Sequence, residues 1–256
     1  MTYEHVKVTP DGPVARIVLA RPEKRNALSL ALMREVVGAL GSLPADVQAV
    51  VVAGEGPAFS AGHDLGEMIG RDAAFYEELF DVCTEMMEAV HRVPQPVVAR
   101  VHGPAFAAGC QLVAACDLAV CVDTATFATP GVKIGLFCST PMVPLSRAVG
   151  RKRAMEMLLT GEPIDAPTAL DWGLVNHVVP AADLDATIDR LLERILRSSP
   201  LVTGIGKQAF YEQIERDEHA AYALTRAVMV ENAQLADAQE GISAFVEKRP
   251  ATWVGR

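Results

Sequence analysis

Short apolar runs alternate with amphipathic segments along the first half of the chain. Runs rich in β-branched residues and bounded by glycine or proline predict buried strands over residues 14–20, 47–53, 97–101 and 118–122. Apolar residues recurring every three to four positions predict helices between them, over residues 30–41, 75–92 and within 103–116. Ser29 is the expected N-cap of the first of these helices. Because strands that alternate with helices need crossover connections, the pattern predicts an α/β core with a largely buried sheet.

From about residue 140 onward the apolar spacing is almost entirely helical. Helices are expected over residues 151–160, 167–172, 183–197, 201–216, 219–237 and 240–248. No repeat and no Gly/Ser linker interrupts the chain. We therefore expect an α/β core over residues 1–200 and a helical C-terminal region over residues 201–256, suited to packing or oligomerisation.

Composition and charge limit the classes of partner and the cellular compartments that we expect for this protein. Lys and Arg number 23 against 32 Asp and Glu, a net charge of −9, so nucleic acid is not an expected partner. Residues 103–122 carry a single charge, Asp117, which would cost about 2.5–3.5 kcal/mol inside a bilayer, so no membrane span is expected. The N-terminus lacks the features of a secretory signal. The five cysteines form no CxxC pair, so we expect neither a metal site nor a disulfide framework, and a cytoplasmic location.

Three segments carry candidate chemistry. Residues 59–65 (FSAGHDL) follow a predicted strand, and residues 102–111 (HGPAFAAGCQ) join a strand to a helix. Small side chains at a helix start let an anionic or polar ligand approach the unpaired N–H groups, although they equally serve close helix–sheet packing. Neither segment matches a dinucleotide or phosphate-loop motif. The third segment, residues 127–140, contains Cys138, either a nucleophile without an identifiable base or an inert buried thiol.

Taken in order, these segments resemble the crotonase superfamily, also called the enoyl-CoA hydratase/isomerase family. The resemblance runs from residues 21–28 (RPEKRNAL) to 245–248 (FVEK), with further landmarks at 59–65, 102–117, 130–135, 148–150, 159–161, 169–175 and 239–241. Residues 135–141 (GLFCSTP) are also similar to a subgroup of hydratase-domain proteins. The resemblance implies repeated ββα units with a helical C-terminal region, and a homotrimer or a dimer of trimers. It also implies an acyl-CoA ligand, in which coenzyme A is part of the thioester substrate and no separate cofactor is used.

The resemblance also implies site residues. The backbone N–H groups of His63 and Ala108 fall on the family's oxyanion hole, which holds the thioester oxygen while an enolate forms. Lys24 and Arg25 are placed to meet phosphates, and Lys248 resembles a lysine that a neighbouring subunit offers, although each is also compatible with solvated surface. The expected substrate-binding residues are Arg25, Asn26, Ala27, Leu28, Ala61, His63, Asp64, Leu65, Ala108, Pro130 and Lys248.

Two positions depart from the family's pattern. Hydratases of the family use two glutamates as acid and base, but this chain has Gln111 and Gly131 at those positions. Glutamine does not exchange a proton near neutral pH, and glycine has no side chain. Efficient hydration of a 2-enoyl thioester is therefore not expected. We expect an acyl-CoA-processing enzyme with altered chemistry; the alternatives are a noncatalytic acyl-CoA-binding or accessory protein, and a relative that no longer binds coenzyme A.

Few titratable groups are available to replace the glutamates. The His63 ring either points inward as an acid or base, or faces away so that only its N–H matters. Asp64 is expected to brace its loop, and Asp117 to tie backbone at the end of its helix. Glu67 is expected either to line the acyl mouth or to be exposed.

Overall fold

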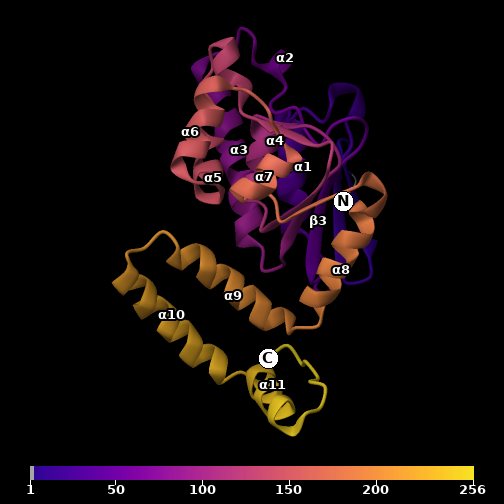
Figure 1. Ribbon diagram of the computed structural model, residues 1–256, viewed down its shortest axis with the longest axis vertical. Coiled ribbons are helices and arrows are strands. Elements are labelled where there is room, and N and C mark those ends of the chain that lie inside the picture. Colours follow the sequence, from indigo (N-terminus) through magenta and orange to yellow (C-terminus); the bar gives the residue numbers. More distant parts are fainter. Residues whose placement is uncertain (1–2) are drawn as a thin grey trace.

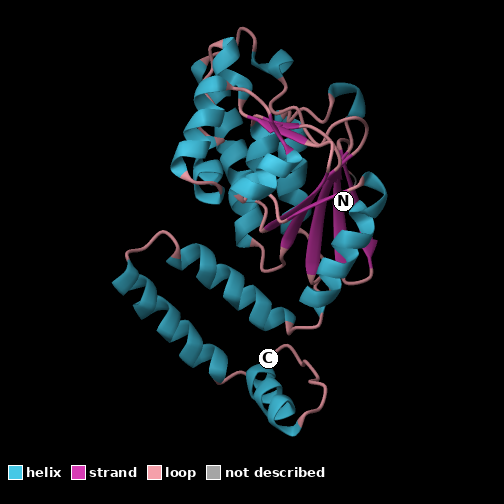
Figure 2. Ribbon diagram, viewed as in Figure 1, coloured by secondary structure: helices cyan, strands magenta, loops and turns pink. Residues whose placement is uncertain are grey.

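Six strands form the main sheet of the protein, whose computed structural model describes residues 3–256. Their order is β1-β2-β3-β4-β6-β9, and every neighbouring pair is parallel except β1 and β2. The strands are β1 (Val6–Asp11), β2 (Val14–Leu19), β3 (Ala49–Gly54), β4 (Val97–Val101), β6 (Leu118–Val122) and β9 (His177–Val179). The central strands are buried, so the expected α/β core is confirmed (Figure 2).

A second, three-stranded sheet crosses the end of the first. It consists of β7 (Thr126–Ala128) between β5 (Ala105–Phe106) and β8 (Ile164–Asp165). Strand β4 continues into β5 and then into helix α4 (Ala108–Ala115), while β6 continues into β7 and a run of helices. This succession of main-sheet strand, small-sheet strand and helix is the expected ββα unit. It brings the start of α4 to the place where the two sheets meet.

Long helices cover the sheet in the upper body of Figure 1. Helix α1 (Leu30–Gly41) begins at the expected cap, where the Ser29 hydroxyl accepts a hydrogen bond from the Leu32 N–H at 3.2 Å. Helix α3 (Ala73–Arg92) packs beside α1 and buries its apolar face. The other short elements are η1 (Pro22–Lys24), α2 (Leu65–Met68), η2 (Pro130–Ile134), α5 (Met142–Ala148), α6 (Arg151–Thr160), α7 (Ala166–Trp172) and η3 (Ala181–Asp183).

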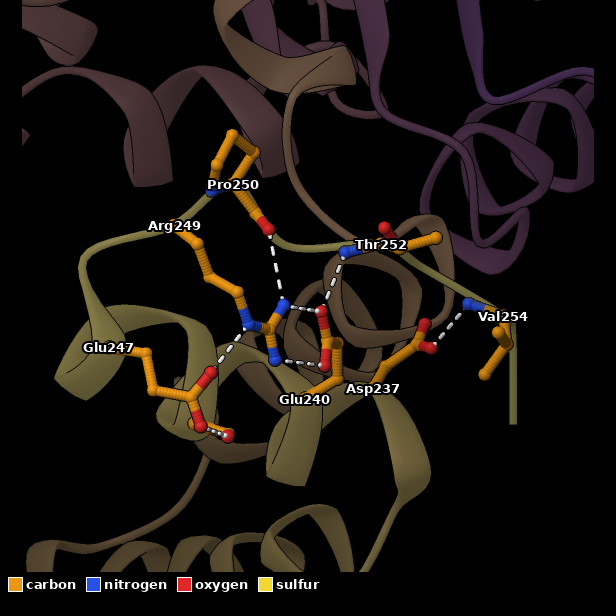
Figure 3. A network of polar contacts seen from close by, with 8 residues as sticks. Asp237, Glu240, Glu247, Arg249, Pro250, Thr252 and Val254 are labelled. Carbon is orange, nitrogen blue, oxygen red and sulfur yellow. Dashed lines mark hydrogen bonds and ion pairs between the residues drawn. The ribbon is translucent and has the colours of Figure 1, made fainter.

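The last three helices extend away from the sheet as an arm (Figure 1). After α8 (Leu184–Leu196), the chain forms α9 (Pro200–Gln213), α10 (Glu218–Ala233) and α11 (Ala236–Glu247). The tail folds back on α11, where Arg249 pairs with Glu240 at 2.6 Å and with Glu247 at 2.7 Å (Figure 3). Among residues 3–256, no helix combines the length and apolar character needed to cross a bilayer.

Candidate functional site

Two loops pair to build one wall of the site. The Leu28 N–H donates to the Gly62 carbonyl at 2.7 Å, and the Asp64 N–H donates to the Leu28 carbonyl at 3.2 Å. In this parallel bridge Leu28 bonds the residues on either side of His63, so the N–H of His63 itself points away from Leu28.

Asn26 fixes the first of these loops from inside. Its amide oxygen accepts the Arg21 N–H at 3.0 Å, and its amide nitrogen donates to the carbonyls of Glu55, Ala58 and Phe59 at 2.8, 2.9 and 3.2 Å. The residue is fully buried. Because these bonds occupy the whole side chain, Asn26 braces the loop rather than facing the cavity.

The start of helix α4 meets the second loop at very short range. Ala107, the N-cap residue, has φ 49° and ψ −118° and provides no side-chain cap. A Cβ on Gly62, which has φ 93°, would lie 2.7 Å from the Ala107 Cβ and 3.2 Å from the Ala108 nitrogen. Only glycine permits this approach, which sets the peptide before His63 against the first turn of α4.

The N–H groups of His63 and Ala108 donate to no acceptor within residues 3–256. Both residues line one cavity of about 470 Å³. The Ala108 N–H belongs to the first turn of α4, where N–H groups lack intrahelical partners and the helix dipole favours negative charge. Two such donors at one cavity are suited to hold a carbonyl oxygen that gains charge.

The rest of the cavity wall is mainly apolar. Of its sixteen lining residues in the described chain, none is an aspartate or glutamate; the large apolar ones are Leu65, Phe80, Ile134, Leu136 and Phe137. The Lys133 ammonium, at the edge, is paired with Glu162 at 2.7 Å. The cavity therefore presents hydrogen-bond donors and apolar surface, without a carboxylate to transfer a proton.

The imidazole of His63 lies edge-on to the Phe80 ring, with 5.6 Å between the centroids. Both ring nitrogens are buried and make no hydrogen bond to the described residues. Burial lowers the pKa of His63, and the nearby Leu28 carbonyl opposes this shift without reaching normal hydrogen-bond geometry. Because the nitrogens are not accessible from the cavity, the geometry favours a role for the main-chain N–H rather than for the ring.

The two positions at which the resemblance implies glutamate, Gln111 and Gly131, differ in their surroundings. A Cβ on Gly131 would lie 2.2 Å from the Leu136 carbonyl oxygen and 2.9 Å from the Cys138 sulfur, so the loop has closed over this position. Gln111 is 3% exposed, and its amide oxygen accepts a hydrogen bond from the Cys83 thiol at 3.8 Å.

Cys138, the candidate nucleophile, lies in the same cavity wall. Burial raises the pKa of its thiol, which favours the unreactive protonated form over the thiolate.

The nearby acidic residues all bond elsewhere. Asp64 caps α2 through the Gly66 N–H at 3.2 Å and pairs with Arg21 at 3.1 Å, which is the expected bracing role. Glu67 neither lines the cavity nor stays free, because its carboxylate accepts the Leu30 N–H at 3.0 Å.

Asp117 lies at the far end of α4 and ties elements together. Its carboxylate accepts the Val97 N–H at 2.6 Å, the Lys207 ammonium at 2.7 Å and the Tyr211 hydroxyl at 2.7 Å. The expected tie to backbone is present, and helix α9 is held to the core by the same group.

The structure brings together only part of the expected substrate-binding set. Five of those residues line the cavity: Ala61, His63, Leu65, Ala108 and Pro130. Asn26, Ala27 and Leu28 are buried and do not line it, and Lys24 and Arg25 are exposed and do not line it either. Lys248 ends α11 on the arm, away from the cavity of its own chain (Figure 1). Phe80 and residues 134–137 were not named among the expected site residues. Phe80 belongs to the helix expected over residues 75–92, and residues 134–137 belong to the third candidate segment, but neither pattern shows which side chains face the cavity.

Known proteins resemble this chain over almost its whole length. The family described as enoyl-CoA hydratase/isomerase matches residues 10–256. Human enoyl-CoA hydratase domain-containing protein 3, mitochondrial, is 48% identical over 248 residues, covering 95% of this chain and 81% of the relative. The crystal structure of an enoyl-CoA hydratase from Mycobacterium smegmatis has a TM-score of 0.95 at 47% identity, covering 98% of this chain and 99% of the other. The crystal structure of the human domain-containing protein 3 has a TM-score of 0.94 at 45% identity, covering 98% and 100%.

These relatives contradict the expected cytoplasmic location. The human, rat and mouse proteins are all named as mitochondrial. The expectation rested on unpaired cysteines, and all five are indeed free thiols. Free thiols indicate a reducing rather than an oxidising compartment, but they do not distinguish one reducing compartment from another.

The match to the family covers nearly the full chain, and the solved structures share both its fold and more than 40% of its residues. The ββα succession and the paired loops at the start of α4 agree with that likeness. The chain therefore belongs to the enoyl-CoA hydratase/isomerase family, the crotonase superfamily.

Proposed function

We propose that the protein binds an acyl-CoA thioester in this cavity and polarises its carbonyl with the main-chain N–H groups of His63 and Ala108. The observation that supports this most directly is that neither donor has an acceptor among residues 3–256 and that both residues line the same mainly apolar cavity. Coenzyme A enters as part of the substrate, and the proposal needs no further cofactor.

The two donors would act on the charge that develops during reaction. As electron density moves onto the thioester oxygen, hydrogen bonds to it strengthen more in the transition state than in the ground state. The apolar surroundings increase this effect because they screen charge poorly. Removing one such donor typically costs about 2.7–4 kcal/mol of barrier lowering.

Efficient hydration is not part of the proposal. Adding water across a double bond needs one group to take a proton from water and another to deliver a proton to carbon. Each such group contributes on the order of 10²–10⁴ in rate, and the cavity lining contains no carboxylate. We therefore propose altered acyl-CoA chemistry through a stabilised oxyanion, which is an enolate in decarboxylation or double-bond migration and a tetrahedral intermediate in thioester hydrolysis.

A second candidate is a noncatalytic acyl-CoA-binding or accessory protein. It is favoured by the state of the titratable groups at the cavity. Burial disfavours both imidazolium at His63 and thiolate at Cys138, so neither is poised to exchange protons with a ligand.

Calorimetric titration with butyryl-CoA and turnover assays separate these candidates. We expect saturable binding, slow or absent hydration of crotonyl-CoA, and turnover in one of thioester hydrolysis, decarboxylation or double-bond migration. Ala108→Pro removes one donor at the first position of α4, whereas Ala108→Gly keeps the N–H. Because Ala107 precedes the new proline with a φ of 49°, circular dichroism and thermal unfolding must show that the proline variant is folded. Turnover lost in the proline variant and kept in the glycine variant supports catalysis. Binding without any turnover supports the noncatalytic role, and rapid hydration or no binding contradicts the proposal.

We further propose that the protein assembles as a homotrimer or a dimer of trimers through its C-terminal arm. Helix α10 has no buried residue in the single chain, and Tyr222, Met229 and Phe245 on the arm are 70%, 66% and 86% exposed. Exposed apolar surface of this extent is typical of an interface. Such an assembly would let Lys248 meet the coenzyme A bound by a neighbouring subunit.

A further inference from the structure

A second cavity of about 500 Å³ lies where helices α3, α4 and α5 face α9. It is not part of the site described above. Its apolar lining includes Met87, Val113, Val143, Pro144, Phe210 and Ile214. Three of these side chains remain about half exposed: Val143 at 49%, Phe210 at 52% and Ile214 at 50%. The single chain therefore leaves an apolar part of this lining exposed.

The second cavity adjoins the first. Thr140 lines both cavities. On α3 the lining passes from Phe80 in the first cavity to Thr84 in the second, and on α4 it passes from Ala108 to Gln111. Residues three or four apart on a helix are neighbours on one face, about 5–6 Å from each other. The two cavities are thus lined by successive turns of the same faces of α3 and α4. They meet at Thr140 and Gln111, which we call the junction.

The side chain at the junction is compatible with an apolar ligand. Gln111 is neutral and buried, and its amide oxygen is already engaged by the Cys83 thiol. An ionised carboxylate at this point would resist desolvation by a passing hydrocarbon chain. A hydrogen-bonded glutamine carries a far smaller penalty.

The charged residues of the second cavity are paired with protein groups. Arg147 on α5 forms a two-pronged ion pair with Glu215 beyond α9, at 2.5 and 3.1 Å, and both side chains are about half exposed. Asp117 is bonded to Lys207 and Tyr211. The lining also includes Glu88, which lies 3.9 Å from Arg92, and His91, whose Nε2 is 2.9 Å from the Ala115 carbonyl oxygen. Each charged side chain of this lining thus has a partner within the described part of the protein.

We propose that the acyl chain of the ligand runs from the N–H groups of His63 and Ala108 past Thr140 and Gln111 into the second cavity. The substrate class is then a long, apolar acyl thioester. This inference rests on the proposed function, because it assumes that the thioester carbonyl lies at those two N–H groups. The continuity of the two linings identifies the occupant as the distal part of the same ligand.

The chain-length dependence of affinity tests the inference. Burying one methylene contributes about 0.8 kcal/mol, which is about a fourfold change in affinity. Calorimetric titration with butyryl-, octanoyl-, dodecanoyl- and hexadecanoyl-CoA is expected to show affinity that still rises from octanoyl to hexadecanoyl. Affinity that stops rising at octanoyl would overturn the inference while leaving the proposed function intact. Failure of butyryl-CoA itself to bind would overturn both.

A matched pair of substitutions on α5 tests whether the dependence of affinity on chain length arises in the second cavity. Val143→Trp fills the second cavity from its half-exposed rim, whereas Ser146→Trp adds the same ring outside the lining. We expect Val143→Trp to lower the ratio of hexadecanoyl-CoA to butyryl-CoA affinity at least tenfold, and Ser146→Trp to leave that ratio unchanged. An unchanged ratio in Val143→Trp would overturn the inference, as would a change in oligomeric state, since that would show a second copy covering the cavity.

Discussion

Gly131 lies beneath the loop of residues 135–139, where a Cβ would be 2.2 Å from the Leu136 carbonyl oxygen. Contacts this short with backbone cannot be relieved by turning a side chain. Restoring glutamate at this position would therefore move the loop that forms one wall of the cavity. The lack of a side chain at Gly131 is therefore what allows the loop to take this position.

We predict that Gly131→Ala lowers the free energy of unfolding by about 1–3 kcal/mol because the added methyl group overpacks the loop. Chemical denaturation measures this change. The control is Gly206→Ala in α9, where a Cβ meets nothing within 4 Å and helix propensity favours alanine by about 0.5–1 kcal/mol. A Gly131→Ala protein as stable as the parent would show that the loop yields and that a side chain fits there.

At the level of single residues, the sequence predicts only those properties that follow directly from the type of residue. Gln111 and Gly131, at the two positions where the resemblance implies glutamate, are visible in the sequence, and among the described residues no aspartate or glutamate lines the cavity. The Asn26 amide donates to the Ala58 carbonyl, and the Glu67 carboxylate accepts the Leu30 N–H. Both hydrogen bonds join segments that are distant in the sequence. Neither could be predicted from local pattern.

Helix α4 starts from a strained residue. Ala107 has φ 49° at the N-cap, a conformation that L-residues rarely adopt, and its N–H donates to the Ala128 carbonyl at 2.8 Å. Ala107 offers no side-chain acceptor to the first turn, and the Ala108 N–H donates to no acceptor among residues 3–256. Strain and an uncapped first turn are typical of sites where backbone groups do the binding.

Removing the strain should therefore stabilise the fold. Positive φ in a non-glycine residue costs about 1–3 kcal/mol, and glycine loses about 0.5–1 kcal/mol in entropy, so Ala107→Gly is expected to gain about 1 kcal/mol. Ala114→Gly, inside the same helix, is expected to lose about 1 kcal/mol. Thermal and chemical unfolding of the two variants provide the comparison. Loss of stability in both would contradict the strain at Ala107.

Elements were predicted best where they are buried. Strands over residues 97–101 and 118–122 and the helix over 151–160 have the expected bounds, because burial on both faces or along one face leaves a clear apolar pattern. Strand β1 was not predicted, since five of its six residues are exposed. The helix expected over residues 219–237 instead ends at Ala233, and a new helix begins at Ala236 after Leu235 as N-cap.

The whole molecule combines a buried core with an arm that is poorly buried by itself. Phe245 and Val246 on α11 are 86% and 73% exposed. The arm is tied to the core through Lys207, whose ammonium donates to the Val90 and Gln95 carbonyls at 2.7 and 2.8 Å. An arm anchored at its base and apolar at its end is suited to contact another subunit.

We predict that Phe245→Asp shifts the protein from trimers or hexamers toward monomers, because a carboxylate in an apolar interface must be desolvated. Light scattering after size-exclusion chromatography measures the mass. Val8→Asp, an apolar-to-acidic change on the exposed strand β1, is the control and is expected to leave the mass unchanged. A monomeric parent protein, or a Phe245→Asp variant of unchanged mass, would contradict the proposed role of the arm.

The infrared carbonyl stretch of a bound acyl-CoA, isotopically labelled at the thioester carbon, tests most directly whether two main-chain donors polarise the ligand. Hydrogen bonds from the His63 and Ala108 N–H groups should weaken the C=O bond and move the band to lower frequency than in water. Ala108→Pro should reverse part of that shift, and Ala108→Gly should retain it. A bound thioester whose band stays at its aqueous frequency would contradict the account.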